Sequence, residues 1–122
     1  MPEEPQETPR FDQSAIEKLR QVAGDQGTAF VAEMAQLFLD ETIKSTSEIA
    51  KARDQGDWKA VTRIAHSLKS SAATLGFMRL SAACRALEVG TKSSTSAKDL
   101  GVLAAAVLDE FEQVRPILKG MA

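Results

Sequence analysis

His66 is the only histidine among the 122 residues of the chain. It lies in a run in which apolar or small residues recur every three or four positions, as they do along one side of an α-helix. This stripe consists of Trp58, Val61, Ala65, Leu68, Ala72 and Leu75. At about 100° per residue, His66 points roughly 145° away from the centre of the stripe. The spacing therefore predicts an imidazole that faces solvent rather than the core.

The chemistry open to such an imidazole is narrow. Without a second histidine or a Ser-His-Asp set, a hydrolytic triad is hard to assemble. The single cysteine, Cys84, stands among apolar residues, which favours a small buried side chain, and no cluster has metal-ligand spacing. An exposed imidazole can still act alone as a nucleophile toward a phosphoryl group. The alternative, an inert surface histidine, stays open at this point.

The neighbours of His66 on the same predicted face are mostly cationic or small. They are Lys59, Thr62, Arg63, Lys69, Ser70 and Ala73. Lys69 follows His66 by three residues, so its ammonium lies close enough to balance the charge of a phosphoryl group. Ser70, one turn after His66, leaves the ring accessible to a second protein and offers a hydroxyl. The alternative for the basic residues is an ordinary solvated helix face.

The elements that position this face are predicted to be helices. Capping and turn residues delimit a short helix from Asp12 or Ser14 to Gly24 and longer helices at about 28–54, 57–75 and 77–90. A polar linker at 91–96 leads to a last helix, which Pro116 should end or kink. We expect an all-α fold, an antiparallel four-helix bundle with the short N-terminal helix across one end. Phe38, in a wide apolar run, is either buried between two neighbours or part of a docking surface.

Bulk properties limit the class of protein. The net charge of −2 argues against nucleic acid as the main partner. No apolar run is long enough to span a bilayer and no signal-peptide pattern is present, so we expect a cytoplasmic protein and no membrane partner. Residues 1–10 are predicted to be a disordered lead or linker, and residues 11–122 a single domain.

The segment from Ala65 to Gly76, AHSLKSSAATLG, resembles the signature of histidine-containing phosphotransfer (HPt) domains. That signature is His, any residue, Leu, Lys, usually Gly, and a further Gly six residues later. Gly56-Asp57 before this helix and the segment CRALE at 84–88 also fit the family. The order of helices fits from about Phe11 to Leu118, so the resemblance covers nearly the whole ordered chain.

The resemblance implies an intermediate of two-component phosphorelays. His66 would accept a phosphoryl group, at Nε2, from an aspartate of one receiver domain and pass it to another. Lys69 would balance the phosphoryl charge, and Ser70 replaces the usual glycine, which puts partner choice or rate in question. Glu88 is placed either to hold the imidazole Nδ1–H or as a solvated carboxylate at a helix end.

The same resemblance implies which proteins this chain would interact with and where the metal ion would come from. Response-regulator receiver domains, and a hybrid sensor histidine kinase, would be the partners of a monomeric carrier that has no cofactor and no metal of its own. The receivers would supply Mg²⁺. We expect a docking face of Lys59, Thr62, Arg63 and Ala73 around the site residues, joined by Phe38. Two alternatives remain: an HPt-like module that binds receivers without phosphotransfer, and a helical enzyme that uses His66 as a general base.

Overall fold

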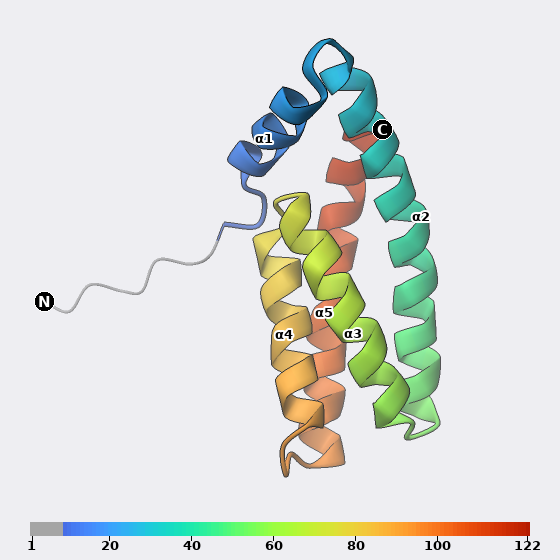
Figure 1. Cartoon of the computed structure of the whole chain (residues 1–122). Coiled ribbons are helices and arrows are strands. Elements are labelled where there is room, and N and C mark those ends of the chain that lie inside the picture. The colour runs from blue at the N-terminus through green and yellow to red at the C-terminus, as the bar shows by residue number, and fades with distance from the viewer. Residues whose placement is uncertain (1–8) are drawn as a thin grey trace, which may run out of the picture.

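The computed structural model describes residues 9–122, which contain five α-helices and no strand. The helices are α1 (Gln13–Ala23), α2 (Gly27–Asp54), α3 (Trp58–Thr74), α4 (Met78–Thr91) and α5 (Ala97–Met121), with a 3-10 turn, Gly24–Gln26, between α1 and α2. Helices α2 to α5 form an antiparallel bundle, and α1 lies across one end of it (Figure 1). The expected fold class is therefore confirmed. The predicted disordered lead falls mainly on residues 1–8, outside the described residues.

Two similar turns set the direction of the helix that carries His66. Gly56 and Gly76 have φ angles of 70° and 86°, which an L side chain adopts only with strain, and they end α2 and α3. Main-chain bonds from Asp57 N to Ala52 O and from Phe77 N to Ala72 O close the turns at 2.8 and 2.9 Å. Asp57 then caps α3 by accepting from the Ala60 N–H at 3.2 Å.

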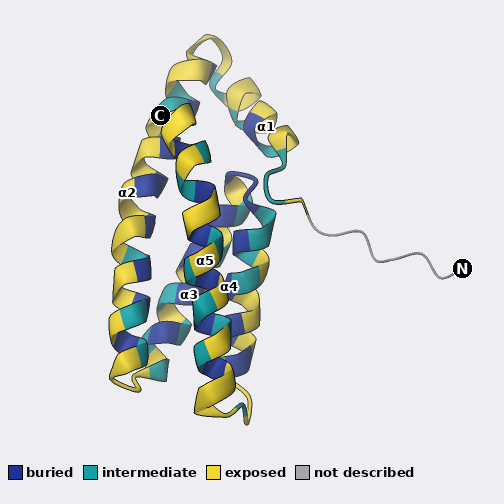
Figure 2. Ribbon diagram, turned by 180° about the vertical axis from the view of Figure 1, so that it is seen from behind, coloured by how far each residue is buried: buried dark blue, intermediate teal, exposed yellow. Residues whose placement is uncertain are grey.

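The core follows the predicted stripes, and buried faces alternate with exposed ones along each helix (Figure 2). Val61, Ala65 and Leu68 of α3 are buried, so the opposite face of the same helix is left to solvent. Helices α3 and α4 lie side by side over their length (Figure 1). This pairing places the C-terminal half of α4 beside the exposed face of α3.

Phe38 is a core residue, which corrects its expected place on the docking face. Its side chain is buried and its ring stacks on Phe77 with centroids 6.0 Å apart. Phe11 stacks on the same ring at 5.1 Å, which ties the segment before α1 to the turn between α3 and α4. Of the apolar run, Leu37 is the large residue that faces solvent.

The sequence predicts that Pro116 ends or kinks the last helix, and the first of these two outcomes is wrong. Helix α5 continues through Pro116 to Met121. Pro116 lies on the exposed side of α5, where water can satisfy the carbonyl that loses its intrahelical donor. Val114 and Leu118, on either side of it, are fully buried and hold the helix against the core.

Candidate functional site

The imidazole of His66 stands on the outer face of α3 with its side chain 65% exposed. The predicted direction of the ring is therefore confirmed. One edge of the ring is held: Nδ1 lies 2.7 Å from Oε1 of Glu88, which comes from α4. Nε2, on the opposite edge of the ring, has no protein partner among the described residues. A reactant has access to that nitrogen.

Glu88 is a buried carboxylate that gathers three donors. Its side chain is only 7% exposed, so it is not a solvated helix-end carboxylate. Oε1 accepts from His66 Nδ1 at 2.7 Å and from Lys92 Nζ at 3.2 Å, while Oε2 accepts from Lys69 Nζ at 2.7 Å. Burial of a carboxylate is costly unless donors and cations compensate it, and these three do so.

The charge state of Glu88 fixes the tautomer of His66. The hydrogen bonds from Lys69 and then from His66 lower the pKa of the Glu88 carboxyl from 4.5 to about 2, against the opposing effect of desolvation. At neutral pH the carboxylate is therefore ionised and can only accept hydrogen bonds. The proton in the His66–Glu88 bond must then belong to Nδ1, so Nε2 of the neutral ring carries the free lone pair.

A chain of hydroxyl contacts links the backbone of α4 to α3 beside the carboxylate. Thr91 Oγ1 donates to the main-chain oxygen of Glu88 at 2.8 Å, and Thr62 Oγ1 lies 2.5 Å from Thr91 Oγ1. Thr62 Oγ1 has a single proton, which it donates either to Thr91 Oγ1 or to the main-chain oxygen of Trp58, 2.8 Å away. These contacts hold α4 against α3 next to His66, and with it the position of Glu88.

A hollow of about 560 Å³ opens between α3 and α4 beside the imidazole. Its walls are Trp58, Lys59, Thr62, Arg63, His66, Glu88, Thr91 and Lys92. Four residues predicted for the exposed face, Lys59, Thr62, Arg63 and His66, thus meet in one concavity. Three cations face it against one carboxylate, so the hollow is suited to an anionic group.

The remaining predicted residues lie on the other side of His66 along α3. Ser70 is exposed and Ala73 is half-buried, and neither lines the hollow. Lys69 is also outside the lining, although its ammonium bonds Glu88, which is part of it. The main-chain oxygen of Ser70 accepts a hydrogen bond from Thr74 Oγ1 at 3.0 Å.

Lys92 is the site residue that sequence reasoning missed. Its position lies in the polar segment at 91–96 that reads as a linker, whereas the structure makes it the C-cap of α4. The signal was present, because Lys92 follows Glu88 by four residues, the spacing at which charged side chains pair on a helix. The spacing predicts this pairing only if α4 is known to extend beyond Gly90.

Other chemistry is poorly supported by the described residues. Burial raises the pKa of the Cys84 thiol to about 12, so it is not a nucleophile at neutral pH. Within residues 9–122, no three of the His, Cys, Asp and Glu side chains are grouped to hold a metal ion. In the same range, no helix is long and apolar enough to cross a membrane.

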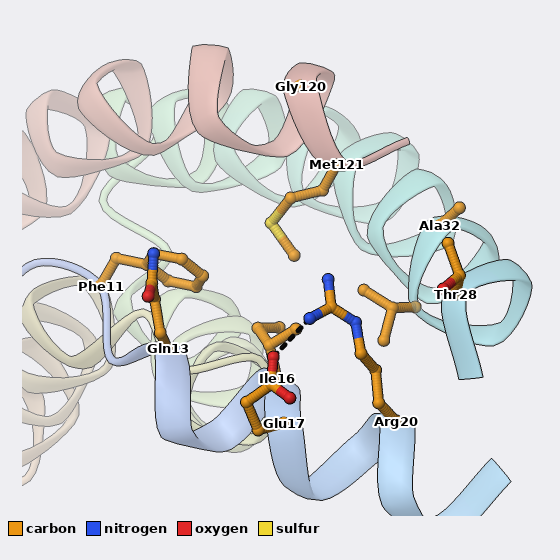
Figure 3. A pocket seen from close by; sticks show the side chains of 10 residues that line it. Phe11, Gln13, Ile16, Glu17, Arg20, Thr28, Ala32, Gly120 and Met121 are labelled. Carbon is orange, nitrogen blue, oxygen red and sulfur yellow. Dashed lines mark hydrogen bonds and ion pairs between the residues drawn. The ribbon is translucent and has the colours of Figure 1, made fainter. Parts of the chain in front are cut away.

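A second hollow, of about 430 Å³, lies at the far end of the bundle under α1 (Figure 3). Ile16 of α1, Val31 of α2 and Met121 of α5 contribute apolar walls. Arg20 and Glu17 form an ion pair along α1 at its edge (Figure 3). It contains no histidine or cysteine, so it offers no comparable nucleophile.

Comparisons with known proteins identify the family and the fold of the chain. The family model of the Hpt domain matches residues 33–116, which include the site. The fold is similar to histidine-containing phosphotransfer protein B (HptB) from Pseudomonas aeruginosa, with a TM-score of 0.77 and 22% identity over 93% of this chain and 95% of that one. It is also similar to a structure from rice assigned as a histidine-containing phosphotransfer protein, with a TM-score of 0.78 and 23% identity over 92% and 79%. No curated protein sequence matches the chain.

Proposed function

The chain belongs to the Hpt domain family and is a phosphorelay intermediate, and we propose that His66 is the residue that carries the phosphoryl group. The observation that carries this proposal is the hydrogen bond of 2.7 Å between His66 Nδ1 and Glu88. It leaves the Nε2 lone pair exposed on a neutral ring, the state in which an imidazole is nucleophilic.

The transfer step follows from that state. The Nε2 lone pair of His66 attacks the phosphorus of a receiver's aspartyl phosphate, forming the N–P bond while the bond from phosphorus to the aspartate oxygen breaks. The aspartate leaves as a carboxylate with the bonding electron pair. The Nδ1 proton stays in place, so the ring gains positive charge as the N–P bond forms. Glu88 lies 2.7 Å from Nδ1 and stabilises that charge.

Lys69 is proposed to balance the charge of the phosphoryl group, and Glu88 to orient the imidazole. In the unphosphorylated protein the Lys69 ammonium is 2.7 Å from Oε2 of Glu88. The same carboxylate therefore holds both the nucleophile and its cationic neighbour. Because both side chains are already held in place, little conformational entropy is lost on reaching the transition state. This arrangement supports the roles assigned to both residues.

Receiver domains are proposed as both donors and acceptors, with a hybrid sensor histidine kinase as one source of donor. The receiver would bring the Mg²⁺ and the acidic pocket that catalyse transfer, so this chain acts as a carrier and not as an enzyme on its own. Lys59, Thr62, Arg63 and Ala73 would surround the contact. Ser70 stands where the family usually has glycine, and its exposed hydroxymethyl group would meet the receiver backbone. We propose further that the carrier is monomeric and cytoplasmic.

The test is incubation of the chain with a receiver domain carrying labelled aspartyl phosphate. The wild-type protein should gain phosphate that is labile to acid and stable to base. The variant His66→Gln should gain none above background, while Ser67→Ala, a change at the neighbouring exposed position, should behave as wild type. Phosphate on His66→Gln would contradict the assignment. A folded wild-type protein that binds receivers and gains no phosphate would favour an interaction module instead.

A further inference from the structure

We propose that Lys92 is a second phosphoryl-binding cation, which pairs with Glu88 in the unphosphorylated protein and with the phosphoryl oxygens once His66 is phosphorylated. The inference rests on the proposed function of His66. It assigns to α4, and not only to α3, a residue that touches the transferred group.

The two lysines on Glu88 are held unequally. Lys69 has Oε2 to itself at 2.7 Å, and its side chain is 28% exposed. Lys92 reaches Oε1 at 3.2 Å, shares that oxygen with the shorter bond from His66, and is 64% exposed. Solvent screens a charge on an exposed side chain more than one on a covered side chain, which weakens the ion pair that it makes. Lys92 is therefore the cation that leaves the carboxylate at the smaller cost.

If the Lys92 side chain leaves the carboxylate, the charge of Glu88 is still compensated by two other donors. The buried oxygens keep the Nδ1–H of His66 and the ammonium of Lys69, each at 2.7 Å. Departure of Lys69 would instead strip Oε2 of the donor whose hydrogen bond contributes most to the low pKa of Glu88. A buried carboxylate that loses such a partner is strongly penalised. The structure thus favours exchange of Lys92 over exchange of Lys69.

The position of Lys92 also suits an anion on the imidazole. Lys92 and His66 line the same hollow, together with Lys59 and Arg63, whereas Lys69 lies outside its walls. A phosphoryl group adds a charge of about −1.5 to −2 near neutral pH. With Lys92 turned to the phosphoryl oxygens, the phosphoryl group gains a cation in addition to Lys69, and Glu88 keeps its bonds from Lys69 and His66.

A ³¹P NMR titration of the full chain tests this assignment. His66 is phosphorylated with phosphoramidate, a small donor that needs no partner protein, and the midpoint of the phosphoryl titration is measured against pH. A neighbouring cation favours the dianion, so loss of Lys92 should raise the midpoint by about one pH unit in Lys92→Gln relative to wild type. Lys92→Arg should restore the wild-type midpoint. Lys119→Gln, the same charge change on an exposed residue of α5, should leave it unchanged.

The outcomes separate the two proposals. A midpoint in Lys92→Gln equal to that of wild type would overturn the role of Lys92, whatever the midpoint in Lys69→Gln. A wild-type protein that takes phosphate from phosphoramidate but never from a receiver would contradict the proposed function and leave the Lys92 result standing. Failure of folded wild-type protein to form any phosphohistidine would contradict both.

Discussion

Two of the hollows in the described part of the protein are similar in size and differ in what their walls can do. The hollow beside His66 has a volume of about 560 Å³, and the hollow under α1 has about 430 Å³. Beside His66, donors from two helices converge on one buried carboxylate. Under α1, the ion pair of Glu17 and Arg20 lies along a single helix and the neighbouring walls are apolar.

This difference shows that concavity alone does not mark the functional site. Side chains three or four residues apart on one helix pair with each other in any exposed helix, and such a pair constrains little. The bond of 2.7 Å from His66 to Glu88 joins residues 22 apart in the chain, so the fold itself must be in place to form it. Convergence of distant residues on a buried charge is the feature that distinguishes the site.

The largest expected effect is a loss of stability, without a loss of phosphotransfer, on substitution at the end of the bundle under α1. Phe77 is fully buried and stacks on Phe11 and Phe38. Phe77→Ala should lower the free energy of unfolding by about 3–5 kcal/mol, measured by urea denaturation, because it removes a core ring and leaves a cavity. Phosphotransfer per folded molecule should stay near the wild-type level. A comparable loss of transfer in the folded fraction would mean that the two regions are not independent.

The next largest effect is expected on the rate of phosphotransfer, from substitution at the site itself. Glu88→Ala should slow phosphotransfer by about 10–100-fold, since loss of a group that orients a functional imidazole has effects of this order. Glu88→Gln should be milder, because the amide oxygen still accepts from Nδ1 at the same position. Phosphotransfer assays with a phosphorylated receiver, quenched at a series of times, measure both rates. Equal rates for wild type and Glu88→Ala would show that the carboxylate does not serve the imidazole.

A smaller effect is expected on the stability of the folded protein at acidic pH. The Glu88 carboxyl has a pKa of about 2 in the folded protein against an ordinary 4.5, so it binds protons more weakly when folded. Its stabilising contribution is therefore fully present above pH 4.5 and is lost as the pH falls toward 2. Unfolding of wild type and Glu88→Gln, compared across that range, should show the wild-type advantage shrinking with acid. An advantage that grew with acid would contradict the ion pairing at Glu88.

The smallest effect is expected in the hollow under α1. Arg20→Gln breaks an exposed ion pair with Glu17, so the free energy of unfolding should change by no more than about 0.5 kcal/mol. Phosphotransfer should be unchanged in the same assay. Reduced transfer in this variant would indicate that partners also contact the α1 end of the molecule.

The sequence predicted the positions of the helices because local signals mark them. Asp12 and Asp57 cap α1 and α3 as predicted, and Gly76 ends the helix that carries His66 at the predicted place. The exposure of His66 also followed from the three-four spacing of apolar residues on α3. These features depend on neighbours in the chain, which a single sequence displays.

Features that depend on packing between helices were predicted less well. Phe38 and Leu37 are adjacent apolar residues, and packing against Phe77 and the rest of the core determines that the first is buried. Pro116 has a strong local preference against helix, and tertiary contacts of α5 override it. Lys92 pairs with Glu88 within α4, but the pair belongs to the site only because α4 lies against α3 and brings Glu88 to His66.

The most direct test of the account is to locate the transferred phosphorus on the protein. After transfer from a phosphorylated receiver to ¹⁵N-labelled chain, one-bond coupling between ¹⁵N and ³¹P identifies the bonded nitrogen. Because Glu88 occupies Nδ1 of His66, we expect coupling to Nε2 of that ring alone. Coupling to Nδ1, or phosphate on a residue other than His66, would contradict it.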